Sequence, residues 1–343
     1  MTPNSEMSAL VLRHDGYAAV GAAQAGPPDL SELLALQRLP RPRIGSGQLL
    51  VRVALSPVNP SDLLYVAGTY GQPRTRGTPA GFEGTGTVIE GGDAEAAALV
   101  GRRVSFLASV SGAWAEVAAT DLGSCVPVAD ALRDEDAAAL YVNPLTAMAM
   151  IELAAQAGAR AVVLTAAGSQ LGRLMIALAR ERGIAPIAVV RRPEAAAALQ
   201  ALGAAQVLVS SADDYPAQRA AMLRTHAPRI LLDAVGDQAA AELFLAMPAH
   251  SRWICYGVLA AGGPQLPDLR AFVFAGKRIE GFWLSRWLRA ASAAEREHAL
   301  QAVQQRFVAG SWRTQVAARV ALADALARLP ALLGAGGKVL LAP

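Results

Sequence analysis

One short segment of the sequence combines small residues at a spacing that suits the binding of a phosphate group. The run Ala161–Thr165 has the length and apolar character of a strand buried in a parallel sheet. The strict dinucleotide fingerprint Gly-x-Gly-x-x-Gly would place its glycines at Ala167, Ser169 and Gly172, so only the last position holds glycine. Small residues still let the backbone approach a pyrophosphate, and amides at a helix start would bind its charge. We therefore predict a dinucleotide-binding turn at Gly168, Ser169, Gln170, Leu171 and Gly172.

Two arginines at the end of the next apolar strand indicate which dinucleotide would bind. A helix is expected at Leu171–Arg182, ended by Gly183, and the strand Pro186–Val190 follows it. An Asp or Glu after this strand commonly binds the 2′-hydroxyl of the unphosphorylated cofactor, whereas this chain has Arg191 and Arg192. Two guanidinium groups suit a 2′-phosphate. We predict NADPH as the cofactor, and the alternative is an ordinary solvated turn with two surface arginines.

The elements that must position these residues divide the chain into a β-rich part and an α/β part. Up to about residue 125, glycines and prolines punctuate short apolar segments, as in barrel-like β folds. Strands are expected there at Gln48–Leu55, Thr85–Glu90 and Arg103–Leu107. From Asp134 onward, expected helices alternate with short apolar strands, which is typical of a doubly wound parallel sheet.

The end of the chain is expected to return to the first domain. The segment Ala291–Pro343 contains a long helix and a terminal strand at Lys338–Leu341. The predicted fold class is therefore α/β, with a β-rich domain formed by residues 1–130 and 290–343. The second predicted domain, residues 131–289, would carry the doubly wound sheet and the dinucleotide.

Composition excludes several classes of protein. The 343 residues are 53% hydrophobic and 17% charged, which allows two packed domains. No apolar run reaches the roughly 18 residues of a membrane span, and no secretory signal is visible at Met1–Leu10. The net charge of +3 is spread along the chain, so nucleic-acid binding is not expected. Cys125 and Cys255 have no partner at metal-ligand spacing, and we expect two core thiols in a cytoplasmic protein.

Four blocks of the sequence carry a resemblance to a known family. They are Val58–Asp62 leading to Gly68–Gly71, Val142–Ala147, the turn with Val189–Pro193, and Gly281–Trp287. In these blocks the chain resembles the medium-chain dehydrogenases/reductases, in the zinc-independent quinone-reductase branch, and is most similar there to mitochondrial-type 2-enoyl thioester reductases. The resemblance implies a GroES-like catalytic domain, a Rossmann domain, and a homodimer joined through the Rossmann sheets.

The resemblance also implies roles for individual residues. Tyr70 corresponds to the catalytic tyrosine of the family. Besides the turn and the two arginines, the cofactor-binding residues that it implies are Asn143, Thr146, Tyr256, Gly257, Val258, Phe282, Trp283, Leu284 and Lys338. The implied reaction is reduction of an activated C=C bond in a trans-2-enoyl thioester of CoA or acyl carrier protein. NADPH would supply the hydride, and Tyr70 would act as the proton donor.

Departures from the family pattern leave other substrates open. Enoyl reductases usually have Gly-Asn-Glu where this chain has Gly81-Phe82-Glu83, and phenylalanine there is more usual among quinone reductases. Gly168 stands where the enoyl reductases tend to have asparagine. An NADPH:quinone oxidoreductase is therefore the main alternative. A non-catalytic dinucleotide-binding protein is a second alternative, and it would bind NADPH without turnover.

The same region argues against a zinc enzyme. Zinc-dependent relatives have Cys, His and Glu near the positions of Asn59, Phe82 and Glu83. Asparagine and phenylalanine cannot supply a thiolate or an imidazole, so no metal is expected. Without a strong Lewis acid to stabilise an alkoxide, alcohol oxidation is disfavoured relative to reduction of a C=C bond or a quinone.

Overall fold

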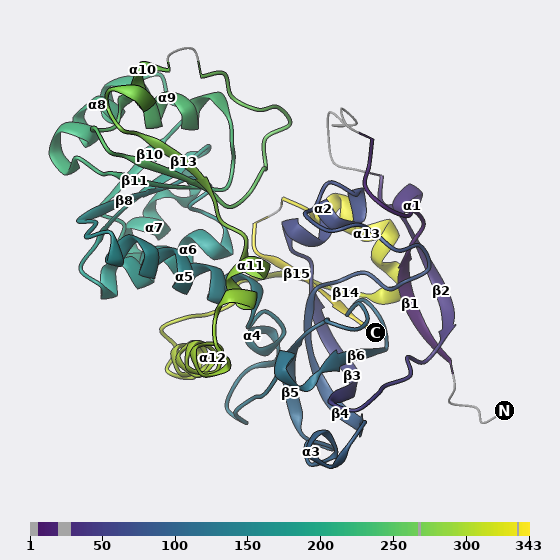
Figure 1. Ribbon diagram of the computed structural model, residues 1–343. Helices are drawn as coiled ribbons and strands as arrows, with labels where there is room; N and C mark the ends of the chain where they lie inside the picture. Colours follow the sequence, from purple (N-terminus) through teal and green to yellow (C-terminus); the bar gives the residue numbers. More distant parts are fainter. Residues whose placement is uncertain (1–5, 20–28, 267–268, 335) are drawn as a thin grey trace. The chain divides into compact units, whose positions relative to one another are not determined.

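The computed structural model describes residues 6–19, 29–266, 269–334 and 336–343, and Figure 1 draws the chain as a ribbon. The chain divides into two compact units. Unit 1 comprises Met1–Val142 and Ala293–Pro343, and unit 2 comprises Asn143–Ser292. Unit 1 is therefore built from both ends of the chain, and unit 2 from the middle.

The segment of residues 131–142, which helix–strand alternation assigns to the nucleotide-binding domain, belongs to unit 1. Helix α4, Asp134–Ala138, packs against strands of that unit. The Ser105 hydroxyl donates a hydrogen bond of 2.8 Å to the carbonyl of Ala137, and the Tyr141 amide donates to the Glu83 carboxylate. These contacts join residues far apart in sequence, so the local pattern does not reveal this boundary.

The strands of unit 1 form a seven-stranded sheet and a separate two-stranded sheet. The larger sheet has the order β14-β15-β3-β4-β5-β7, and β6 also pairs with β3. Its strands are β3 Gln48–Pro57, β4 Glu83–Gly91, β5 Arg103–Leu107, β6 Val117–Asp121, β7 Cys125–Pro127, β14 Val316–Ala321 and β15 Lys338–Ala342. The smaller sheet pairs β1 Glu6–Leu12 with β2 Leu34–Pro40. The strand β15 thus lies between the edge strand β14 and β3.

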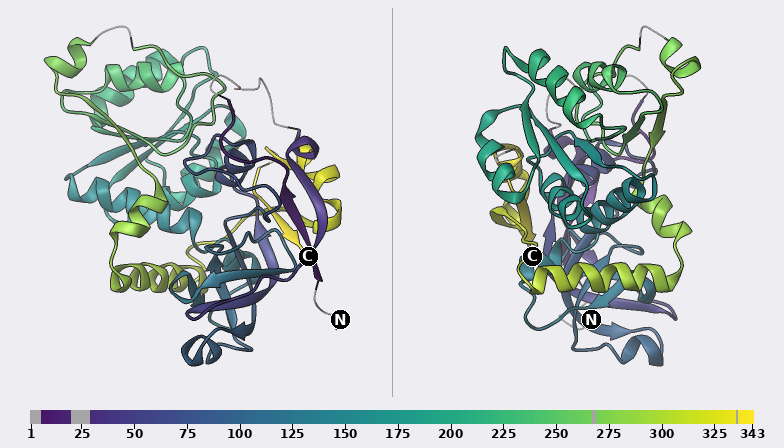
Figure 2. Two further views of the ribbon diagram at one scale, coloured as in Figure 1. Left: turned by 45° about the vertical axis from the view of Figure 1, so that its right-hand side comes forward. Right: turned by 90° about the vertical axis from the view of Figure 1, so that its left-hand side faces the viewer.

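Besides α4, the described part of unit 1 contains further helices. They are α1 Leu30–Leu33, α2 Pro60–Ala67, α3 Ala94–Ala97, α12 Ala293–Val308 and α13 Ala325–Leu332, with the 3-10 turns η1 Leu122–Ser124 and η3 Leu322–Asp324. Helix α12, drawn in yellow-green in Figure 2, has 16 residues and is the longest helix in the described part of this unit. Leucines and valines from both ends of the chain pack around the buried Trp114 to form one core.

Unit 2 is a doubly wound α/β unit. Its six strands are all parallel, in the order β10-β9-β8-β11-β12-β13. They are β8 Ala161–Leu164, β9 Ala185–Val190, β10 Gln206–Val209, β11 Ile230–Asp233, β12 Arg252–Cys255 and β13 Arg278–Gly281. Every residue of β8 and β11 is buried, as expected for central strands of a parallel sheet.

Helices cover both faces of this sheet. They are α5 Val142–Gln156, α6 Gln170–Glu181, α7 Ala196–Leu202, α8 Tyr215–His226, α9 Gln238–Ala246, α10 Arg270–Val273 and α11 Leu284–Ala290, with the 3-10 turn η2 Pro193–Ala195. Figure 1 shows α5, α6 and α7 on one face of the sheet, and α8 and α9 on the other. Within the described residues, no helix is both long and apolar enough to cross a membrane. Cys125 and Cys255, expected in the cores, are free thiols that are only partly buried.

Candidate functional site

The turn after β8 is compact because small residues let α6 start directly against the strand. Ser169 caps α6, and its hydroxyl accepts a hydrogen bond of 3.1 Å from the Gly172 amide. A Cβ atom on Gly172 would lie 2.5 Å from the Ala167 carbonyl oxygen, so only glycine fits there. Ala166 takes a positive φ of 46°, which turns the chain from the strand into the helix. The first amides of α6 therefore stand at the end of β8, where a pyrophosphate would lie.

Arg191 and Arg192 lie beside this turn, directly after β9. The turn lies close to the end of β9, since a Cβ atom on Gly168 would be 3.9 Å from Cγ1 of Val190. Both arginine side chains are exposed. The Ser211 hydroxyl donates a hydrogen bond of 2.6 Å to the backbone carbonyl of Arg191. In the described part of the chain, no acidic side chain forms an ion pair with either guanidinium. Both are therefore available to an anionic ligand.

A buried carboxylate organises the ends of the neighbouring strands. Asp233, the last residue of β11, accepts hydrogen bonds from the Thr165 hydroxyl and from the indole Nε1 of Trp253, the latter at 2.9 Å. Its two oxygens also accept from the amides of Val235 and Gly236, each at 2.9 Å. Asp233 thereby joins the ends of β8, β11 and β12. Its buried charge is satisfied by these four donors.

The loop after β12 contains a buried tyrosine hydroxyl group. A Cβ on Gly257 would lie 2.7 Å from the Ala234 carbonyl oxygen, so this loop passes close to the loop after β11. The Tyr256 hydroxyl is buried, and no hydrogen-bond partner for it exists among the described residues. Burial raises the pKa of Tyr256, and the Asp233 charge adds to this effect. A neutral, unpartnered phenol is a donor that a polar ligand could satisfy.

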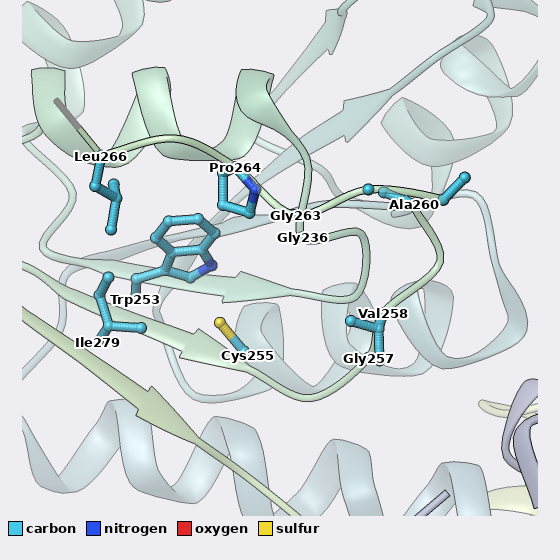
Figure 3. A pocket seen from close by; sticks show the side chains of 12 residues that line it. Gly236, Trp253, Cys255, Gly257, Val258, Ala260, Gly263, Pro264, Leu266 and Ile279 are labelled. Atoms are coloured by element: carbon cyan, nitrogen blue, oxygen red, sulfur yellow. The ribbon is translucent and has the colours of Figure 1, made fainter. Parts of the chain in front are cut away.

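A mainly apolar pocket of about 390 Å³ opens beside these strand ends (Figure 3). Its lining residues are Gly236, Trp253, Cys255, Gly257, Val258, Ala260, Ala261, Gly262, Gly263, Pro264, Leu266 and Ile279. Burial raises the pKa of the Cys255 thiol to about 11, so the thiol is protonated at neutral pH. The predicted residues Gly257 and Val258 therefore line a pocket within the size range of small-molecule sites.

The remaining predicted residues of unit 2 lie at the starts of two helices. Asn143 and Thr146 are buried and lie among the first five residues of α5. Phe282 is bound through its amide to the Cys255 carbonyl, at 2.8 Å. Trp283 and Leu284 follow at the start of α11, and the Arg289 guanidinium lies 5.0 Å from the Trp283 ring centroid.

Tyr70 and Lys338 belong to unit 1, in contrast to the other predicted site residues. The Tyr70 ring lies 5.1 Å from the ring of Phe82, which also contacts Tyr65. The backbone amide of Phe82 donates to Asp62 at 2.8 Å. A buried carboxylate thus fixes the backbone of the residue against which Tyr70 packs.

Lys338 is buried in a network of polar side chains. Its ammonium donates to the Asn59 side-chain oxygen, and the Asn59 amide donates to Glu83 at 2.9 Å. Burial raises the pKa of Glu83 and lowers that of Lys338, while their opposite charges act against both shifts. Asp62, which accepts from the Asn59 amide at 2.7 Å, has its pKa raised to about 7, mainly by burial.

Comparison with known proteins places the chain in a family. Residues 45–130 match the alcohol dehydrogenase GroES-like domain, and residues 171–305 match the zinc-binding dehydrogenase model. A solved structure from Mesorhizobium loti, of a protein assigned as an NADPH:quinone reductase, is 43% identical with a TM-score of 0.94, and covers 100% of both chains. The chain belongs to the medium-chain dehydrogenase/reductase superfamily. The predicted fold, with a GroES-like and a Rossmann-type part, is confirmed.

Other superfamily members similar to this chain carry two different names. The mitochondrial enoyl-[acyl-carrier-protein] reductase of Dictyostelium discoideum is 26% identical over 314 residues, covering 88% of each chain. That of Arabidopsis thaliana is 28% identical over 277 residues, covering 79% of this chain and 72% of the other. The quinone oxidoreductase of Thermus thermophilus, solved with NADPH, is 27% identical with a TM-score of 0.76, covering 98% and 100%.

Asn59 and Glu83, two of the three residues expected near the zinc-ligand positions of zinc-dependent relatives, are hydrogen-bonded to each other. Asn59 bridges Lys338 and Glu83, and the Glu83 carboxylate accepts from the amides of Tyr141 and Val142, each at 3.0 Å. The donor set available there is an amide, a phenyl ring and a carboxylate next to an ammonium group, which does not suit a divalent cation. Among the described residues, no cluster of His, Cys, Asp and Glu could hold a metal ion.

Three buried acids of this superfamily member escaped the sequence prediction as functional residues. Asp62, Glu83 and Asp233 each satisfy several backbone or side-chain donors inside the fold. The sequence feature that could have indicated these acids is an acidic residue next to a short apolar segment, as in Ile230–Asp233. Their partners lie too far away in sequence for spacing to identify them.

Proposed function

We propose that this protein is a cytoplasmic NADPH-dependent reductase of an activated C=C bond, with a trans-2-enoyl thioester as substrate. The observation that carries the cofactor assignment is the turn at the start of α6 beside Arg191 and Arg192, neither of which is paired with an acidic side chain in the described structure. The turn would bind the pyrophosphate, and the arginines would bind the 2′-phosphate. The enoyl reductases among the relatives support the substrate assignment.

In the proposed reaction, the cofactor supplies the hydride and Tyr70 acts on the charge that develops on the substrate. NADPH supplies a hydride to the β-carbon of the enoyl thioester when it is bound. Negative charge then develops on the thioester oxygen of the substrate. The Tyr70 hydroxyl donates a hydrogen bond or a proton while this charge forms. The Phe82 ring packs against the Tyr70 ring, and Asp62 binds the Phe82 backbone amide.

A quinone is the second candidate substrate, and two observations favour it. Phe82 stands where enoyl reductases usually have asparagine, and the M. loti relative is assigned as a quinone reductase. A quinone accepts a hydride from NADPH without a proton donor at Tyr70. The two candidates therefore differ in their dependence on the Tyr70 hydroxyl.

The test compares the two substrate classes in the presence of NADPH. A series of enoyl-CoA thioesters and a panel of quinones are assayed with the wild-type protein and with Tyr70→Phe. For an enoyl reductase, this substitution lowers thioester turnover by about ten- to a thousandfold, whereas Tyr17→Phe, on an exposed ring, leaves it unchanged. Rapid quinone reduction that persists in Tyr70→Phe would establish the alternative, and tight NADPH binding without turnover would indicate a non-catalytic protein.

A further inference from the structure

The Glu83 side chain binds the backbone at the point where the chain leaves unit 1. Its Oε2 accepts hydrogen bonds from the amides of Tyr141 and Val142, both at 3.0 Å. Val142 is the last residue of the first segment of unit 1 and the first residue of α5. The carboxylate is buried, with 1% of the residue exposed, so these bonds do not compete with water. Glu83 therefore fixes the point from which α5 begins.

The donor and acceptor roles are fixed in the hydrogen bonds that join Lys338, Asn59 and Glu83. Lys338 has only donors, so the Asn59 oxygen must face its ammonium group. The Asn59 amide nitrogen must then face Glu83, at 2.9 Å from Oε1. This leaves Oε2 for the two backbone amides. The Asn59 side-chain amide therefore cannot flip, because a flip would place its NH₂ group against the Lys338 ammonium and its oxygen against the Glu83 carboxylate.

The charge of Glu83 suits this place for a second reason. The amides at the start of a helix carry partial positive charge, and a carboxylate there is stabilising. α5 has 15 residues, so its first turn presents several such amides. Lys338 on β15 neutralises the buried carboxylate through Asn59 and thereby reduces the cost of its burial.

We propose that Glu83 is a positioning residue for the cofactor, because it holds the start of α5, the helix that carries Asn143 and Thr146. This inference rests on the proposed function, in which those two residues contact NADPH. Asn59 and Lys338 support Glu83 by fixing the orientation of its carboxylate. The consequence is that NADPH affinity depends on Glu83, whose Oε2 binds the backbone just ahead of the cofactor-binding residues.

The test exchanges the chemistry of positions 59 and 83. Glu83→Gln places an NH₂ group against either the Asn59 amide or the backbone amides, so one donor pair clashes. Asn59→Asp places two carboxylates against each other. The double variant Asn59→Asp/Glu83→Gln satisfies every contact again, because the introduced carboxylate accepts from both Lys338 and the introduced amide. It also keeps the net charge and nearly the same volume.

Three measurements on the intact chain follow from this design. NADPH affinity, titrated by cofactor fluorescence, weakens about tenfold or more in Glu83→Gln, the loss expected for one unsatisfied buried polar group. It returns to within about threefold of wild type in the double variant. Hydrogen exchange without cofactor shows faster exchange at the Tyr141 and Val142 amides in Glu83→Gln, and wild-type protection in the double variant. KM for NADPH rises more than kcat falls.

The outcomes separate this inference from the proposed function. Failure of the wild-type protein to bind NADPH would refute the proposed function, while the exchange measurement would still report on Glu83. Wild-type affinity in Glu83→Gln, or a double variant that is folded but no better than the single one, would overturn the positioning role. If Glu83→Gln does not fold, Asn59→Ser removes the donor to Glu83 with less disturbance, and unchanged NADPH affinity in that variant would also overturn it.

Discussion

Buried ionisable side chains are the chemically distinctive residues of unit 1. Asp62, Glu83 and Lys338 are each at most 5% exposed, and they lie within one network. Burial raises the pKa of Asp62 to about 7, and the nearby charge of Glu83 adds to this, while two backbone amides and Lys338 oppose it. An acid with a raised pKa binds its proton more tightly in the folded state than in the unfolded chain.

The free energy of unfolding should therefore depend on pH through the protonation of Asp62. Between about pH 4 and pH 7 the folded state binds the extra proton, so the contribution of Asp62 to stability falls as the pH rises through this window. Denaturant unfolding of the wild type and of Asp62→Asn at several pH values measures it. The wild type gains stability relative to the variant as the pH falls from 7 to 4. A difference that does not change with pH would contradict the raised pKa.

The two exposed arginines give a prediction about cofactor choice. Replacing both Arg191 and Arg192 with alanine removes the groups proposed to bind the 2′-phosphate, so NADPH affinity falls by about tenfold or more, and NADH affinity changes little. The ratio of the two dissociation constants is the measured quantity. Arg224→Ala, an exposed arginine in the last turn of α8, serves as the matched control. Equal loss for both cofactors would refute the role.

At the scale of elements, the close approach of α6 to β8 depends on one glycine. Alanine normally stabilises a helix relative to glycine by about 1 kcal/mol. At Gly172, however, its Cβ would lie 2.5 Å from the Ala167 carbonyl oxygen, and backbone cannot yield as a side chain does. The steric effect should exceed the helix propensity, and α6 must then shift away from the turn.

Gly172→Ala should accordingly lower the free energy of unfolding by about 1–3 kcal/mol and weaken NADPH binding. Gly123→Ala in unit 1 is the control, because nothing lies within 4 Å of the Cβ that it would add. Thermal unfolding and NADPH titration of both variants test the comparison. Equal stability of the two variants would show that the turn can relax.

Local elements could be predicted from the sequence, whereas the contacts between distant elements could not. The predicted strand Arg103–Leu107 matches the structure at both ends, and Ala161–Thr165 differs from β8 by one residue, because their apolar runs are bounded by polar or turn residues. The turn before α6 was also found from its small residues. The contact of Lys338 with Asn59 spans 279 positions, and nothing local to either residue indicates it. Position 59 therefore suggested a missing zinc ligand rather than a link in a hydrogen-bonded network.

At the scale of the whole molecule, the edge strand β13 gives a prediction about assembly. In the described part of the chain β13 pairs only with β12, and Ile279 on it is 41% exposed. Next to it in the sequence, Leu269, Val273 and Phe274 are 69%, 70% and 82% exposed. An unpaired edge flanked by apolar side chains is a suitable surface for a second copy.

We expect a homodimer formed through this edge. Sedimentation should give twice the 35.5 kDa mass of one chain. Phe274→Asp should shift the protein toward the monomer, whereas Val100→Asp, an exposed apolar residue of unit 1, should not. A monomeric wild type at micromolar concentration would contradict this expectation.

The position of β15 sets an order of events during synthesis. Unit 2 is one continuous stretch, so it can fold as soon as it has left the ribosome. Unit 1 cannot, because β14 and β15 are translated after unit 2, and β15 must then pair with β3 and bring Lys338 to Asn59. Until then β3 lacks a neighbour, and Glu83 lacks its counter-charge. Unit 1, whose first segment is translated before unit 2, is therefore completed only after unit 2.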